Sequence, residues 1–230
     1  MKVAAAKEAL KEGRAAQLDE RYSTALEAYN RAIQNDPELV SAYLGRGLVK
    51  EKLNLLDEAI QDYDRALALA PEDESAYLSR GRAYLLQVQS EKALADFERS
   101  LSIEPENSAA LFHRGLVALR NGDLASAMTD FERSAEIEPQ SADAAYGRCL
   151  VLLERNLLED ALFACTLSLR LGYSSREQRV RARRTLVVLH HSLSSPEQAQ
   201  AALQSALADS PDDPELLALI DASNEGEQVE

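Results

Sequence analysis

The residue types that most often carry out chemistry are few in this chain of 230 residues, and they form no catalytic or metal-binding pattern. The only histidines are His113, His190 and His191, and the last two are adjacent, so on one helix they point about 100° apart. Cys149 and Cys165 show no zinc-ligand spacing. No phosphate-binding glycine loop or nucleophile motif occurs. We therefore expect no enzymatic activity, no metal and no cofactor, and we interpret the cysteines as buried thiols.

A ladder of opposite charges is the most regular chemical feature. Its members recur every 34 residues and are Arg46, Arg80, Arg114 and Arg148, together with Asp62, Asp96 and Asp130. The arginines could form a row that binds an anionic ligand. We favour a structural ladder of partly buried ion pairs, because the first repeat lacks both charges. Pairing within a repeat leaves Arg148 over, whereas pairing with the next repeat leaves Arg46 over. The sequence supports both schemes equally.

A basic patch lies in residues 170–184 of an otherwise acidic chain with a net charge of −14. Besides Arg170, it contains Arg176, Arg179, Arg181, Arg183 and Arg184. It could bind an acidic peptide, a nucleic-acid phosphate or an anionic lipid head group. We favour a solvated helix face paired with neighbouring carboxylates. Nucleic-acid binding is disfavoured by the net charge and by the lack of nearby aromatic residues other than Tyr173.

The elements that position these residues are repeated pairs of helices. Apolar residues recur at the helical spacing of three and four, for example over 40–53 and 56–69, and several columns repeat every 34 residues. One column is Pro37, Pro71, Pro105 and Pro139; others are Gly13, Gly47, Gly81 and Gly115, and Tyr29, Tyr63, Phe97 and Phe131. A fixed period of this length predicts a solenoid of helix–turn–helix repeats.

The pattern resembles the tetratricopeptide repeat, which combines small, aromatic and proline positions in this order. The matching residues of two repeats are Tyr43, Gly47, Ala59, Tyr63, Ala66 and Pro71, and Tyr77, Gly81, Tyr84, Ala93, Phe97 and Pro105. The resemblance implies an all-α, right-handed α-solenoid of six repeats with a C-terminal capping helix.

A single solenoid is expected over residues 1–222. Its repeats are placed at 6–39, 40–73, 74–107, 108–141, 142–175 and 180–213, followed by the cap at 214–222 and a disordered acidic tail at 223–230. The last repeat is displaced by four residues, which we place around 171–175. Four residues are about one helical turn, so we expect them to lengthen the following helix.

The resemblance also implies partner binding in a concave groove lined by the first helix of each repeat. The groove residues by register are Leu44, Leu48, Leu78, Arg82, Leu85, Phe112, Leu116, Leu119, Arg120, Tyr146, Leu150 and Leu153. Leu85, Leu119 and Leu153, near the helix ends, could instead pack against neighbouring helices. The basic clamp with which one subclass binds carboxylate termini is absent.

We therefore interpret the chain as a non-enzymatic scaffold or adaptor for protein–protein interaction. Its partner would be an apolar or amphipathic peptide or helix of another protein. Self-association into a homo-oligomer is the alternative, and anionic-ligand binding through 170–184 is a further one. No apolar run is long enough to span a membrane, and with only two cysteines we expect a cytoplasmic location.

Overall fold

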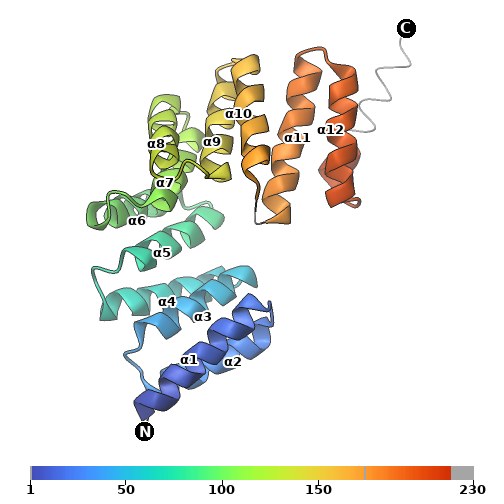
Figure 1. Ribbon diagram of the computed structural model, residues 1–230. Helices are drawn as coiled ribbons and strands as arrows, with labels where there is room; N and C mark the ends of the chain where they lie inside the picture. Colours follow the sequence, from blue (N-terminus) through green and yellow to red (C-terminus); the bar gives the residue numbers. More distant parts are fainter. Residues whose placement is uncertain (1, 174, 219–230) are drawn as a thin grey trace. The chain divides into compact units, whose positions relative to one another are not determined.

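The computed structural model describes residues 2–173 and 175–218. Within these residues the secondary structure consists of helices without strands, which confirms the all-α prediction (Figure 1). Twelve helices have thirteen residues or more. They are α1 (Lys2–Leu18), α2 (Tyr22–Asn35), α3 (Val40–Lys52), α4 (Leu56–Leu69), α5 (Glu74–Leu86), α6 (Ser90–Ile103), α7 (Ser108–Arg120), α8 (Leu124–Ile137), α9 (Ala142–Glu154), α10 (Leu158–Leu171), α11 (Arg176–Ser192) and α12 (Pro196–Asp209).

The chain divides into two compact units, Met1–Val117 and Ala118–Glu230. We call them the N-terminal and C-terminal units. In the N-terminal unit α1 packs on α2, α3 on α4 and α5 on α6, and the first helices α1, α3 and α5 also touch in succession. In the C-terminal unit α9 packs on α10 and α11 on α12. Residues 214–218 of the expected cap are helical, whereas 219–222 and the tail 223–230 lie outside the described residues.

The helices pack closely because a column of glycines faces a column of aromatic rings. Tyr63 of α4 is fully buried, and a Cβ added at Gly47 of α3 would lie 2.5 Å from its ring. Gly45, two residues earlier, approaches Tyr29 of the preceding repeat equally closely. Each ring therefore fills the space between two successive first helices. A methyl group at these glycines would force the packing to shift.

The turn within each repeat has the same backbone conformation in every pair. One residue adopts a positive φ after the first helix: Glu20, Asn54, Val88, Gly122, Asn156 and Ser194. At the second of these turns the Leu55 amide donates to the Lys50 carbonyl at 2.9 Å, and the Asn54 amide donates to the Glu51 carbonyl at 3.0 Å. These two bonds form a Schellman motif, which satisfies carbonyls that the helix end leaves without partners.

The sixth pair contains an extra helical turn, although not where the sequence analysis placed it. The link 172–175 has the same length as the link 138–141 of the preceding repeat, and α11 begins 34 residues after α9. However, α11 is 17 residues long, whereas α9 has 13. The four additional residues therefore lie within α11 and not around 171–175. The predicted lengthening of this helix is confirmed, and its position is corrected.

Candidate functional site

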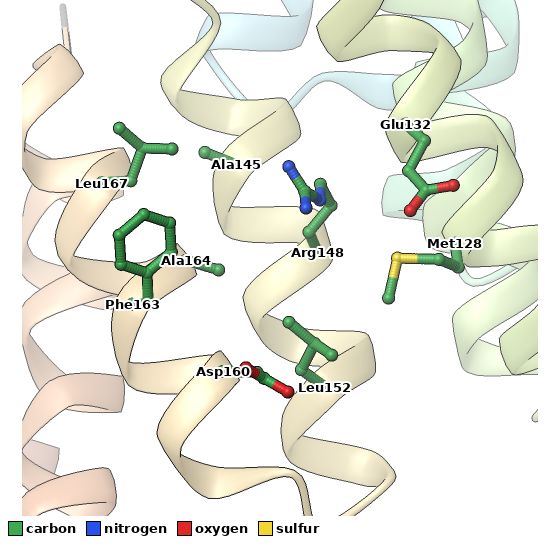
Figure 2. Close-up of a pocket in the computed structure, with 9 residues that line it drawn as sticks. All are labelled: Met128, Glu132, Ala145, Arg148, Leu152, Asp160, Phe163, Ala164 and Leu167. Carbon is green, nitrogen blue, oxygen red and sulfur yellow. The ribbon is translucent and has the colours of Figure 1, made fainter.

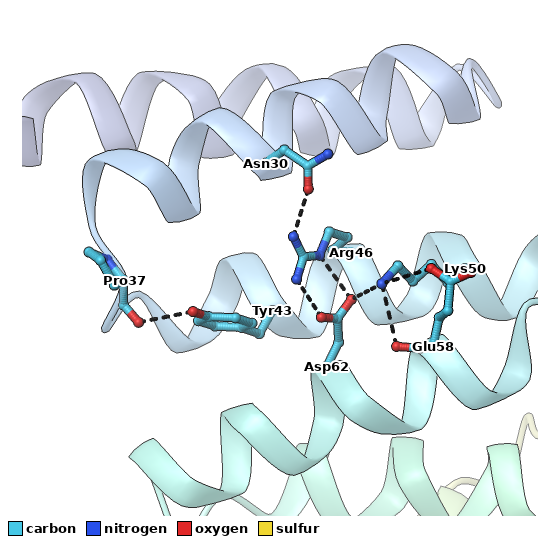
Figure 3. A network of polar contacts seen from close by, with 7 residues as sticks. All are labelled: Asn30, Pro37, Tyr43, Arg46, Lys50, Glu58 and Asp62. Atoms are coloured by element: carbon cyan, nitrogen blue, oxygen red, sulfur yellow. Dashed lines mark hydrogen bonds and ion pairs between the residues drawn. The ribbon is translucent and has the colours of Figure 1, made fainter.

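The second rung of the charge ladder joins the two helices of one repeat. Arg46 of α3 donates from Nε and Nη2 to the two carboxylate oxygens of Asp62 on α4, at 2.9 and 2.6 Å (Figure 3). The Asp62 side chain is only 5% exposed, and Lys50 approaches it to 3.0 Å. Arg46 also donates to Asn30 of α2 at 2.6 Å. The planar guanidinium thus connects three helices, as a bidentate arginine can.

The third repeat contains the same arrangement with a second carboxylate. Arg80 of α5 donates from Nε and Nη2 to Asp96 of α6 at 2.8 and 2.7 Å, and from Nη1 to Asp64 of α4 at 2.6 Å. These hydrogen bonds, above all those to Asp96, raise the pKa of Arg80. One guanidinium can therefore hold two carboxylates in this fold, one from its own repeat and one from the repeat before.

A tyrosine completes each of these two rungs. The Tyr43 ring lies 5.6 Å from the Arg46 guanidinium and 6.0 Å from that of Arg65. Tyr77 stands in the same way between Arg80 and Arg99, at 5.6 and 5.8 Å. Both geometries are suited to cation–π attraction. The sequence analysis did not include these tyrosines in the ladder, although their 34-residue spacing pointed to it.

The last two rungs differ from the first two. The third pair has Arg114 in the N-terminal unit and Asp130 in the C-terminal unit. Arg148 of α9 has Ala164 at the position sixteen residues on, where the other rungs have aspartate. Its Nε is shielded from solvent and has no hydrogen-bond partner in the described part of the chain. The observed pairs join residues of the same repeat, and this register leaves Arg148 over.

The predicted groove residues of the N-terminal unit are half-buried. This holds for Leu44, Leu48, Leu78, Arg82, Leu85, Phe112 and Leu116. Leu78 and Leu85 pack against the buried cluster around Phe97, and Leu44 packs against two neighbouring clusters. Leu48, Phe112 and Leu116 keep part of their surface in solvent without joining these clusters.

Arg82 is engaged inside the N-terminal unit rather than free at a groove rim. It donates to Glu51 of α3 at 2.6 Å, and the Glu51 side chain is 7% exposed. The Tyr63 hydroxyl donates to the other oxygen of Glu51 at 3.2 Å. Burial and the nearby Glu51 carboxylate raise the pKa of Tyr63. This network ties α3, α4 and α5 together, and the sequence analysis did not find it.

The groove residues of the C-terminal unit contribute mainly to its core. Tyr146 is 8% exposed, and its hydroxyl makes a 3.0 Å hydrogen bond with Thr185 of α11. Leu150 and Leu153 pack against the same cluster, which includes Cys149 and Cys165. Leu119 is half-buried and Arg120 is exposed. Tyr146 is therefore a core residue of this unit and is not accessible to a partner.

Most arginines of the basic patch are paired with carboxylates. Asp209 of α12 accepts from Arg179 at 2.8 Å and from Arg183, and these hydrogen bonds and charges lower the pKa of Asp209. The remaining pairs are Arg181 with Glu177, and Arg184 with Asp213 and Glu215. Arg176 lies beside Arg184 in a shallow pocket near Asp213. The charges of this helix are thus largely compensated by α12 and the segment after it.

The histidine and cysteine side chains are placed as core residues. His113 stacks on Phe97 with a ring separation of 5.6 Å, and desolvation, with a smaller contribution from Arg82, lowers the pKa of its imidazole to about 3. Cys149 and Cys165 are buried free thiols, and burial together with their mutual contact raises the pKa of Cys165. Within residues 2–173 and 175–218, no cluster of side chains could hold a metal ion. No helix in those ranges has the length and apolar character needed to cross a membrane.

The helix pairs and their glycine–aromatic packing define a class, and the comparison with known families agrees with it. The tetratricopeptide repeat profile matches residues 10–74, 51–107 and 78–142, which together cover more than half of the chain. The protein belongs to the tetratricopeptide repeat family. Among proteins with curated descriptions, none matches the sequence.

Solved structures of low sequence identity share the fold. The Cut9–Hcn1 hetero-tetramer of the APC/C matches with a TM-score of 0.87 and 18% identity over 95% of this chain. The match covers 42% of that chain, so the present protein spans less than half of its length. PilF of Pseudomonas aeruginosa matches with a TM-score of 0.77 and 17% identity, covering 96% of this chain and 99% of that one. YrrB, described as a TPR protein with an unusual peptide-binding site, matches with a TM-score of 0.56 and 23% identity, covering 84% and 98%.

Proposed function

We propose that the protein is a non-enzymatic interaction scaffold that binds an apolar or amphipathic segment of another protein. The proposed surface is formed by the first helices α3, α5 and α7 of the N-terminal unit. Its main residues are Leu48, Phe112 and Leu116, which are half-buried and lie outside the described core clusters. This partial exposure of apolar side chains on first helices is the observation that carries the proposal, since such a surface gains free energy when a partner covers it.

Two comparisons are consistent with this proposal. Cut9 is described in a complex with another protein, and YrrB is described as having a peptide-binding site. Because their identities to this chain are 18% and 23%, they support the kind of function and not a particular partner. The buried free thiols of Cys149 and Cys165 suit a reducing compartment, so we retain the cytoplasm as the proposed location.

The two alternative functions are separated by different observations. Binding of an anionic ligand through the basic patch is disfavoured by the ion pairs that Arg179, Arg181, Arg183 and Arg184 already make. Self-association would use the same apolar surface as partner binding. It is distinguished by the mass of the purified protein in solution, measured by sedimentation equilibrium over a range of concentrations.

The experiment that tests the proposal is affinity capture with matched variants. A double variant, Phe112→Asp and Leu116→Asp, places two charges on the proposed surface. The control, Leu55→Asp and Leu86→Asp, places the same charges on side chains that are 42% and 57% exposed and lie off this surface. We expect both proteins to fold, as judged by circular dichroism, and only the first to lose the partners of the natural protein. Equal capture by the natural protein and the Phe112/Leu116 variant would show that this surface is not the binding site.

A further inference from the structure

The C-terminal unit has a hollow at the place where a rung of the charge ladder is incomplete. Its lining side chains project from α8, α9 and α10, with the Arg148 guanidinium directed between Ala145 and Glu132 (Figure 2). The hollow has a volume of about 240 Å³. This space suits one or two side chains and is smaller than the pockets that hold drug-sized ligands.

The complete rungs show which side chains are missing. At Arg46 and Arg80 the guanidinium is covered by a tyrosine three residues earlier and an aspartate sixteen residues later. At Arg148 these two positions are Ala145 and Ala164, both less than 9% exposed. The rung has therefore lost one carboxylate and one aromatic ring, and the hollow is the space that remains.

The hollow keeps an unfulfilled binding capacity. The Nε of Arg148 is shielded from solvent without a hydrogen-bond partner in the described part of the chain. Arginine has five donors in a fixed fork that matches a carboxylate. Around it, Leu152 and Leu167 are half-buried, and the Phe163 ring is 74% exposed beside the opening. A cation and an exposed apolar rim thus lie within one small space.

The acidic residues of the hollow are compatible with an anionic ligand. Glu132 occupies the register position of Asp64, and Asp64 shares Arg80 with a second carboxylate. The presence of Glu132 therefore leaves room for one more carboxylate on Arg148. Asp160, exposed at the other end of the hollow, has no such precedent and should weaken the binding of an anion by repulsion.

We propose that the hollow between α8 and α10 is a docking site for a partner segment that presents a carboxylate next to an aromatic side chain. The carboxylate accepts hydrogen bonds from Arg148, as Asp62 and Asp96 do from the arginines of their own repeats. The ring occupies the space above Ala145, where the other rungs have Tyr43 and Tyr77. The partner thereby completes the rung in trans. This site lies in the C-terminal unit, so it is independent of the surface proposed on α3, α5 and α7.

The test uses the full chain and three fluorescein-labelled peptides of a Gly-Ser background. One carries a central Asp-Tyr pair, the second Asn-Tyr and the third Asp-Ser. In fluorescence anisotropy we expect saturable binding of the Asp-Tyr peptide and at least tenfold weaker binding of the other two. Without saturable binding of the Asp-Tyr peptide, or with equal binding of the Asn-Tyr peptide, the proposal fails.

Protein variants locate the binding. Arg148→Met removes the cation, and Ala164→Asp supplies the missing carboxylate from within the chain; both should weaken binding at least tenfold. Asp160→Asn should strengthen it two- to threefold. The control is Arg181→Met, which removes an exposed arginine of α11. The Nε–H resonance of Arg148 should shift when the peptide is added. Binding that survives both Arg148→Met and Ala164→Asp overturns the proposal.

Discussion

The rungs at Arg46 and at Arg148 show what one residue can do in two settings. In the N-terminal unit Arg46 has a buried carboxylate, an amide oxygen and a tyrosine ring around it, and it joins neighbouring helices. In the C-terminal unit Arg148 stands at the same register position beside two alanines, and its Nε has no partner in the described chain. The same cation is a structural tie in one repeat and an open binding group in the other. The residues around it decide which.

The largest effect expected from breaking this comparison comes from Asp62→Ala. The substitution leaves Arg46, whose side chain is 20% exposed, without its buried carboxylate, and Lys50 also loses a partner. We expect a loss of about 3 kcal/mol in the free energy of unfolding, measured by urea denaturation. The matched control is Asp64→Ala, which removes a carboxylate that is 51% exposed and should cost about 1 kcal/mol or less. Equal losses in the two variants would contradict the structural role of the rung.

Acid sharpens the comparison, because the N-terminal unit holds the buried His113. Burial lowers the pKa of this imidazole to about 3, whereas an unfolded histidine titrates near 6.5. Between these values the unfolded state binds more protons, so stability falls as the pH decreases, by up to roughly 1.4 kcal/mol per pH unit from this group. His113→Phe keeps a ring on Phe97 and should remove this contribution.

The measurement is the difference in unfolding free energy between the natural protein and His113→Phe, followed from pH 7 to pH 4. Carboxylates contribute equally to both proteins and cancel in the difference. We expect the natural protein to lose stability relative to the variant throughout this range. A difference that does not change with pH would show that His113 becomes protonated in the folded protein as readily as in the unfolded one.

The smallest effect is expected for Arg148→Met. This substitution removes a guanidinium that makes no ion pair in the described chain and leaves an apolar side chain of similar length beside Leu152 and Leu167. We expect a change of less than about 0.5 kcal/mol in unfolding free energy. The corresponding Arg46→Met should cost several times more, because Asp62 would remain buried without its arginine. Similar costs at the two positions would remove the distinction between a tie and an open group.

The sequence predicted the fold well because the repeat is encoded in local patterns. Glycine, aromatic and proline columns at one period require helix pairs that pack in the same way each time, as Gly47 on Tyr63 illustrates. The predicted rungs were also readable from spacing, but the choice of partner was not. Residues 46 and 62 become neighbours only through the angle between α3 and α4, and this angle is set by packing.

The candidate site was less predictable for the same reason. The burial of Tyr146 depends on Thr185, 39 residues away on α11, and Arg82 meets Glu51 across 31 residues. Such contacts follow from the stacking of repeats and have no signature in the local sequence. The hollow at Arg148 was different, because Ala145 and Ala164 departed from columns that were already visible. The notable signal there was a missing residue rather than a motif.

The uniform turn within each repeat has a consequence for how such a gene can change in length. Only one of its six positive-φ positions is a glycine, so the conformation is imposed by the helix pair and tolerates residues as different as Glu20 and Val88. Duplication or deletion of one whole repeat would therefore join two segments whose backbones already match at the seam. The extra turn in α11 shows a second permitted step, since Ser194 closes the lengthened helix with the same conformation. The chain can grow by a repeat or by a helical turn without acquiring a new kind of loop.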